Sequence, residues 1–66
     1  MMISLNGEPY ELRTSLTLSV LAERLKLEGK RYAIEVNEEI ISRSEHSSYE
    51  LKEGDKVELV VAIGGG

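Results

Sequence analysis

The sequence predicts an α+β fold in which a mixed sheet of four or five strands packs against one helix. Three observations lead to this prediction: a hairpin pattern over residues 1–13, a single amphipathic helical pattern that follows Thr17, and a strongly apolar strand pattern over residues 57–63. Because one helix covers only one face of a sheet, we expect the other face to remain open. We expect residues 1–66 to form one domain.

The N-terminal hairpin pattern has its turn at Asn6-Gly7. Apolar side chains alternate with their neighbours over residues 1–5 and again over residues 8–13. Asn-Gly is the pair that most readily forms a type I′ turn, so two antiparallel strands are predicted. Pro9 lacks the N–H that a central strand needs, which favours an edge position for the second strand.

The predicted helix begins after Thr17, whose hydroxyl is suited to accept hydrogen bonds from the free N–H groups of the first turn. Apolar residues then recur with helical spacing, at Leu18, Leu21, Ala22 and Leu25. This pattern predicts one amphipathic helix of about three turns. Gly29 is placed to adopt the left-handed conformation that ends a helix.

Two further strands are predicted at residues 32–36 and at Ile40-Ile41, with a turn at residues 37–39 between them. Residues 42–48 are polar and aperiodic, which indicates a surface loop with room for one helical turn. Its lone histidine, His46, has no metal-binding or acid–base neighbours in the sequence pattern. We therefore expect neither role for it.

The last strand is the most apolar segment of the chain and follows a turn signal, Glu53-Gly54-Asp55. Its nearly continuous apolar run over residues 57–63 predicts a central strand. The residues that alternate onto the helix side are Val57, Leu59, Val61 and Ile63. Val60 and Ala62 then lie on the open face, where we predict that they dock a partner.

Composition removes several classes of function. With no Cys and one His, the chain has no disulfide or metal to support its small core, and no bound cofactor is expected. A formal net charge of -4 and scattered basic residues argue against nucleic acid as a partner. No segment approaches the roughly 18 apolar residues of a membrane-spanning helix, and the N-terminus does not resemble a secretory signal. We expect a cytoplasmic protein that is monomeric when free.

The sequence ends in Gly64-Gly65-Gly66. Glycine has no Cβ, so such a tail keeps its backbone freedom and fits a channel too narrow for side chains. Its reactive group is the α-carboxylate of Gly66. A frayed end or a cloning scar is the alternative interpretation. Because the tail follows a predicted central strand directly, we favour a functional tether in which Gly64 and Gly65 thread into a partner.

These features together resemble the ubiquitin-like β-grasp family and, within it, the ThiS family of bacterial sulfur carriers for thiamin biosynthesis. The resemblance runs along the whole chain, from the Asn6-Gly7 turn through residues 34–41 and 51–58 to the terminal glycines. It implies that the first and last strands lie parallel in the centre of the sheet, joined by a right-handed crossover.

The resemblance also implies the function of a carrier that is not itself an enzyme. In that function an adenylating enzyme consumes ATP to activate the Gly66 carboxylate, and a persulfide donor converts the acyl group to a thiocarboxylate. Thiazole synthase then takes the sulfur.

Two other interpretations stay open. Molybdopterin-synthase small subunits and protein-conjugating modifiers share the fold and tail, although the molybdopterin carriers usually have proline before the diglycine, where Ala62-Ile63 stand here. A β-grasp domain can also be a plain interaction module that uses the Val60 face.

Overall fold

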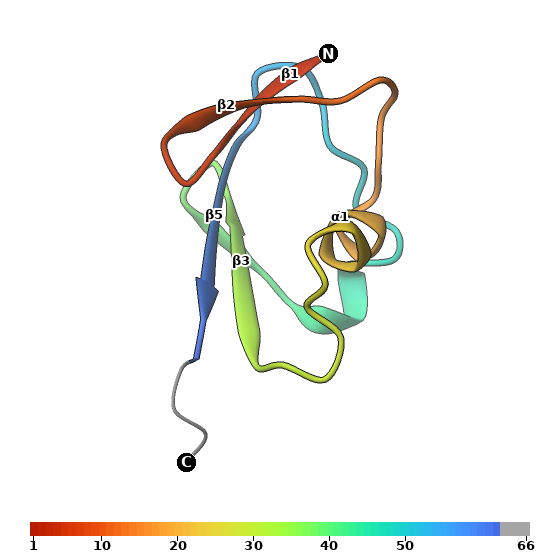
Figure 1. The fold of residues 1–66 in the computed structure, drawn as a ribbon, viewed down its shortest axis with the longest axis vertical. Coiled ribbons are helices and arrows are strands. Elements are labelled where there is room, and N and C mark those ends of the chain that lie inside the picture. Colours follow the sequence, from red (N-terminus) through yellow and green to blue (C-terminus); the bar gives the residue numbers. More distant parts are fainter. Residues whose placement is uncertain (63–66) are drawn as a thin grey trace.

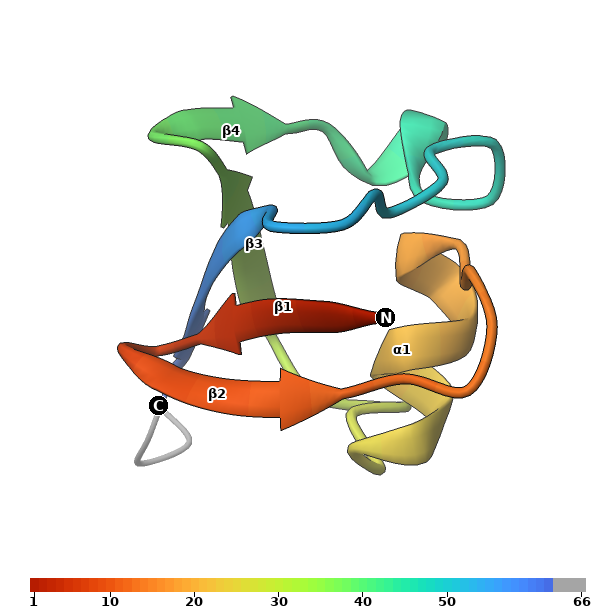
Figure 2. The same ribbon diagram turned by 90° about the horizontal axis from the view of Figure 1, so that it is seen from above.

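The sheet contains five strands in the order β2-β1-β5-β3-β4 in a computed structural model that describes residues 1–62 (Figure 1). The elements along the chain are β1 (Met2–Leu5), β2 (Glu8–Glu11), α1 (Leu18–Arg24), β3 (Tyr32–Val36), β4 (Glu39–Ile41), the short 3-10 helix η1 (Arg43–Glu45) and β5 (Lys56–Val61). Seen from above, the sheet curves round one side of α1 (Figure 2). The predicted α+β class, with one helix on a mixed sheet, is confirmed.

The last strand lies in the centre of the sheet, as its apolar pattern predicts. β5 pairs in parallel with β1 and antiparallel with β3, while β2 and β4 are the two edge strands. The parallel pairing of the first and last strands, which the family resemblance implies, is confirmed. Pro9 lies in the edge strand β2, where its missing N–H leaves no ladder bond unmade.

The first hairpin has the predicted turn but a shorter second strand. Asn6 and Gly7 have φ angles of 51° and 85°, as a type I′ turn requires. β2 ends at Glu11, whereas the alternation predicts a strand as far as residue 13. The alternation continues because Leu12 is still buried, with its N–H donating to the carbonyl of Met1 at 2.7 Å. Burial therefore extends one residue beyond the ladder.

The second hairpin uses the same kind of turn with a less favourable residue. Asn37 and Glu38 join β3 to β4 and have φ angles of 53° and 72°. Asparagine tolerates this left-handed conformation, but glutamate rarely adopts it, because its Cβ crowds the backbone. Glu38 thus occupies the position that Gly7 occupies in the first hairpin.

We expect Glu38→Gly to raise the free energy of unfolding by about 1 kcal/mol, because glycine adopts this conformation without the Cβ clash. The substitution also removes the exposed Lys56–Glu38 ion pair, whose 3.8 Å contact contributes little in water. Urea denaturation measures the change. Glu39→Gly is the matched control, since it removes the same side chain from ordinary strand backbone and is expected to destabilise the protein. Equal effects of the two substitutions would contradict the strain argument.

The helix begins as predicted but ends earlier. The Thr17 hydroxyl accepts from the N–H of Val20 at 3.2 Å, which caps the first turn. α1 ends at Arg24, so Gly29 lies too far along the chain to be its stop, although its φ is also positive. Lys26 adopts the left-handed conformation instead, with φ of 60°, and its N–H and the next one return to helix carbonyls.

The core fills the space between α1 and the sheet. Its buried aliphatic residues are Ile3, Leu12, Leu16, Leu18, Leu21, Ile34, Val36, Ile41, Leu51 and Val57. Leu18 from the helix and Val57 from β5 are both completely buried. The start of the helix and the start of the central strand are therefore packed into the same core.

The prediction that residues 42–48 form a surface loop is wrong for His46. Residues 42–48 do contain the expected helical turn, η1, but that turn directs the His46 ring inward, where only 3% is exposed. Its Nε2 lies 3.0 Å from the carbonyl oxygen of Ile41 and must donate, since a carbonyl accepts. The ring stacks on Tyr32 with centroids 6.1 Å apart, and the Arg43 guanidinium covers the Tyr32 ring at 3.9 Å. His46 is thus a core residue.

Candidate functional site at the end of the last strand

The end of β5 is held firmly in the sheet. Val61 pairs with Tyr32 on β3, and the N–H of Ala62 donates to the carbonyl of Arg31 at 2.9 Å. Ile63 and the predicted threading and reactive residues Gly64, Gly65 and Gly66 lie outside the described residues. The last residue with a described hydrogen bond is therefore Ala62, which stands two residues before Gly64 in the sequence.

The two faces of β5 are divided as the alternation predicts. Val57 is buried, and Leu59 and Val61 are half-buried on the side of α1. Val60 is 64% exposed on the opposite, open face, and Ala62 is exposed as well. The two predicted docking residues thus stand free at the end of the central strand.

The structure adds two residues to this apolar surface, which we call the open-face patch (Ala33, Ile40, Val60 and Ala62). Ala33 is the direct cross-strand partner of Val60, and Ile40 on β4 is 68% exposed on the same face. Neither residue is predicted as a site residue from the sequence. Alternation within β3 and β4 was the available signal, but the register between β3 and β5 was needed to place Ala33 beside Val60.

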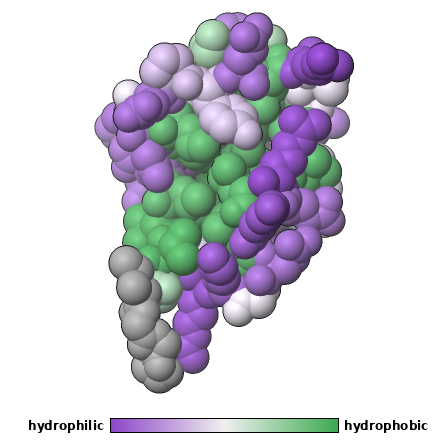
Figure 3. Space-filling model, in the orientation of Figure 1, coloured by the Kyte–Doolittle hydropathy of each residue, from purple (hydrophilic) through white to green (hydrophobic). Residues whose placement is uncertain are grey.

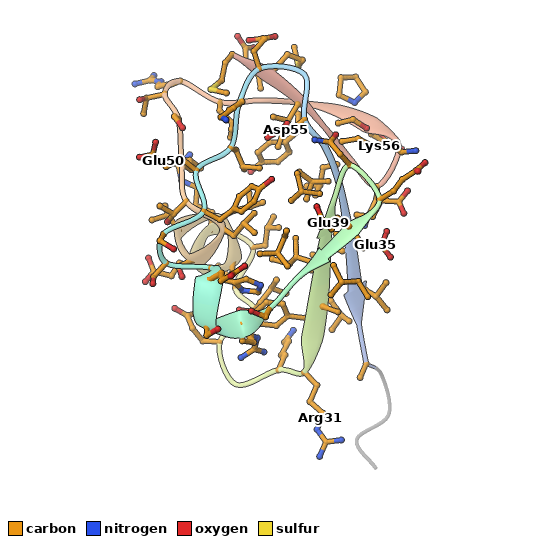
Figure 4. The ribbon with its side chains drawn as sticks, turned by 180° about the vertical axis from the view of Figure 1, so that it is seen from behind. Arg31, Glu35, Glu39, Glu50, Asp55 and Lys56 are labelled. Carbon is orange, nitrogen blue, oxygen red and sulfur yellow. The ribbon has the colours of Figure 1, made fainter. Side chains whose placement is uncertain are left out.

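Two carboxylates interrupt the open-face patch. Glu35 on β3 stands directly opposite Glu58 on β5, and Figure 4 shows Glu35 on the side of the sheet away from the helix. Like charges in direct cross-strand register destabilise a sheet. Among residues 1–62 neither carboxylate forms an ion pair, so the open face favours a partner surface with a basic side chain.

Arg31 lies at the same end of the sheet as the end of β5. Its side chain is exposed and points away from the strands in Figure 4. The site therefore combines an apolar patch and an acidic pair on one face with a basic residue at the base of the tail.

Other groups of the described chain do not form a second reactive centre. In residues 1–62 no group of three or more His, Cys, Asp and Glu side chains could hold a metal ion. Burial raises the pKa of the Tyr49 phenol, and the carboxylates of Asp55 and Glu39 raise this pKa further, so the phenol is neutral at physiological pH. None of the helices in this part of the chain has the length and apolarity to cross a membrane.

A mixed sheet with parallel β1 and β5 at its centre, curved round one helix, defines a β-grasp domain. A central last strand that leads into glycines places the chain with the carriers of this fold class. The family model described as the ThiS family matches residues 3–66, which is nearly the whole sequence. The chain belongs to the ThiS family.

Solved structures agree with this assignment. The crystal structure of the thiamine biosynthesis protein ThiS from Geobacter metallireducens superposes with a TM-score of 0.84 at 30% sequence identity, with all of both chains covered. The solution structure of a thiamine biosynthesis protein from the same organism has a TM-score of 0.83, also at 30% identity, and covers all of this chain and 88% of the other.

Two curated relatives show different lengths. Protein ycf40 of Porphyra purpurea is 38% identical over 65 residues, which cover 97% of this chain and 90% of the relative. A thiazole synthase of Paramagnetospirillum magneticum is 35% identical over 66 residues, and this chain spans only 20% of its length. Carriers of the ThiS family take part in thiamine biosynthesis, bind no cofactor and are non-catalytic.

Proposed function

We propose that the protein carries sulfur as a thiocarboxylate on Gly66, after an adenylating enzyme has activated the carboxylate with ATP. A carboxylate is a poor electrophile, because its oxygen is a poor leaving group. Attack of that oxygen on the α-phosphorus of ATP releases pyrophosphate and forms an acyl adenylate. AMP is then a good leaving group for an incoming sulfur. We place this reaction in the cytoplasm.

The sulfur comes from a persulfide donor. Its terminal sulfur attacks the acyl carbon and AMP departs, which leaves the carrier joined to the donor through a sulfur–sulfur bond. A thiol cleaves this bond, is itself oxidised to a disulfide, and leaves the thiocarboxylate on Gly66. Thiazole synthase is the proposed acceptor, and the similarity to part of a thiazole synthase of Paramagnetospirillum magneticum supports an association between the two activities.

The observation that carries this proposal is the position of β5. The strand is central and pairs with β3 up to Val61, Ala62 is hydrogen-bonded to Arg31, and the three glycines begin two residues later in the sequence. In the proposed complex the open-face patch docks the partner through Val60 and Ala62, while Gly64 and Gly65 enter its active-site channel. A docked domain with a narrow tether brings Gly66 to the reacting groups at high effective concentration.

Intact mass spectrometry tests the proposal. We expect incubation with the adenylating enzyme, ATP and a sulfur donor to raise the mass of the protein by the difference between sulfur and oxygen. A variant that lacks Gly66 is the matched control and should keep its mass. An unmodified wild-type protein, under conditions that convert a known thiamin sulfur carrier, would contradict the proposal.

A further inference from the structure

The backbone groups of β5 alternate between its two neighbours. The even-numbered residues bond toward β3, since the carbonyl of Lys56 accepts from Asn37 N–H at 2.7 Å and Ala62 N–H donates to the carbonyl of Arg31 at 2.9 Å. The backbone N–H and C=O groups of the odd-numbered residues point the opposite way, toward β1. The odd-numbered residues therefore form hydrogen bonds only as far along β5 as β1 pairs with it.

On the β1 side the pairing stops before β5 ends. Asn6 N–H donates to the carbonyl of Val57 at 2.9 Å, and the side-chain Oδ1 of Asn6 accepts from Leu59 N–H at 2.7 Å. The chain then turns away at Gly7. Within residues 1–62, neither the carbonyl of Leu59 nor the N–H of Val61 has a hydrogen-bond partner. Figure 1 shows β5 continuing past the β1–β2 hairpin with β3 on one side only.

This free edge of β5, defined by the Leu59 carbonyl and the Val61 N–H, lacks the protection that other sheet edges have. β2 carries Pro9, and β4 has only three residues, both of which hinder strand addition. Beside the free edge, half-buried Leu5, Leu59 and Val61 leave apolar surface on the helix side. Figure 3 shows apolar side chains gathered at the surface along this part of β5.

An extended peptide segment can add to this edge as a strand. The Leu59 carbonyl would accept one of its backbone hydrogen bonds, the Val61 N–H would donate another, and the neighbouring apolar surface would contact its side chains. A second copy of this chain is a poor occupant, because each copy has a formal net charge of -4 and the two would repel. A partner with a basic surface suits the net negative charge of the chain and the carboxylates of Glu35 and Glu58 on the adjoining open face, which form no ion pair within residues 1–62.

We propose that the free edge of β5 receives an extended segment of the adenylating enzyme, which joins the sheet beside Leu59 and Val61. This inference rests on the proposed function and specifies how the partner holds the end of the strand. One N–H of the segment donates to the Leu59 carbonyl, one carbonyl accepts from Val61 N–H, and an apolar side chain of the segment lies against Leu5. The added strand aligns the chain beyond Ala62 with the partner's channel.

Amide hydrogen exchange measured by NMR tests the added strand in the wild-type protein. In the free carrier, Val61 N–H should exchange fast, whereas Ala62 N–H, bonded to Arg31, should be protected. With saturating adenylating enzyme and a non-hydrolysable ATP analogue, we expect the exchange of Val61 N–H to slow by about tenfold or more. Unchanged exchange of Val61 in the saturated complex would overturn the inference. Protection that grows with carrier concentration in the absence of the enzyme would also overturn it, because a second copy would then be the occupant.

A proline substitution tests the same bond by affinity. Val61→Pro removes the outward-facing N–H of β5, changes the side chain, and leaves the hydrogen bonds toward β3, which even-numbered residues make. Relative to Val61→Ala, which shortens the side chain but keeps the N–H, we expect about fivefold weaker binding to the adenylating enzyme, as for one lost hydrogen bond. Equal affinities of the two folded variants would contradict the inference, and the exchange experiment decides the question if Val61→Pro does not fold.

The mass assay for the thiocarboxylate separates this inference from the proposed function. If the thiocarboxylate forms while Val61 N–H stays unprotected in the complex, the added strand is wrong and the carrier function stands. If the enzyme binds and protects Val61 but no thiocarboxylate forms, the carrier chemistry is wrong and the added strand stands.

Discussion

Gly65→Ala should leave the fold unchanged and slow adenylation of the carrier by more than about tenfold, which corresponds to about 1.4 kcal/mol of transition-state stabilisation. The fold is expected to survive because the buried core lies within residues 3–57. The reaction is expected to slow because the added methyl group obstructs a channel shaped for glycine, and small displacements of a reacting group are costly. Initial rates of pyrophosphate release measure the effect.

The separate effects on kcat and KM for adenylation distinguish obstruction of the channel from weaker docking. Gly65→Ala should lower kcat with little change in KM, because the substitution does not alter the open-face patch, the proposed docking surface. Val60→Ser is the contrasting variant and should raise KM, since Val60 is 64% exposed on the face that the proposed complex buries. Equal rates for Gly65→Ala and the wild type, with unfolding midpoints that also agree, would refute the steric explanation.

Leu18→Ala should cause the largest loss of stability, about 3 kcal/mol of the free energy of unfolding. Leu18 is completely buried at the start of α1, so its truncation removes apolar contacts and leaves a cavity between the helix and the sheet. A domain of this size has a total stability of roughly 5–15 kcal/mol at most, so the variant should be partly unfolded in mild denaturant.

Val20→Ala is the control for Leu18→Ala on the same helix. Its side chain is 37% exposed, and alanine has the higher helix propensity, so a change within about 0.5 kcal/mol is expected. Urea titrations followed by far-UV circular dichroism measure both variants. Similar losses for the two would show that the helix contributes through propensity rather than through the contact of Leu18 with the core.

Local signals in the sequence predicted most of the fold because each one acts over a few residues. Asn6-Gly7 specifies a type I′ turn through its own backbone preferences, and the Thr17 hydroxyl caps a helix through one hydrogen bond three residues on. The predicted stop at Gly29 was wrong because Lys26 adopts the left-handed conformation earlier, at an intrinsic cost that the burial of the Leu27 side chain offsets.

The candidate site was predicted in part. Val60 and Ala62 followed from alternation along one strand, which needs no knowledge of neighbours. Ala33 and Ile40 were missed because they join the patch only through the register of β3 with β5 and β4. His46 was misplaced because one histidine in a polar stretch has no periodicity, and only the inward turn of η1 buries it against Ile41.

By itself the sequence determined the turns, the helix start, the central position of the last strand and the glycines that follow it, because each depends on local conformational preference or on the apolar character of one segment. Only the tertiary structure decided where β1 leaves β5, and hence that Leu59 and Val61 keep a free edge beside the start of the tail. The physical reason is that backbone hydrogen bonds between distant segments depend on strand length and register, which no single stretch of residues encodes.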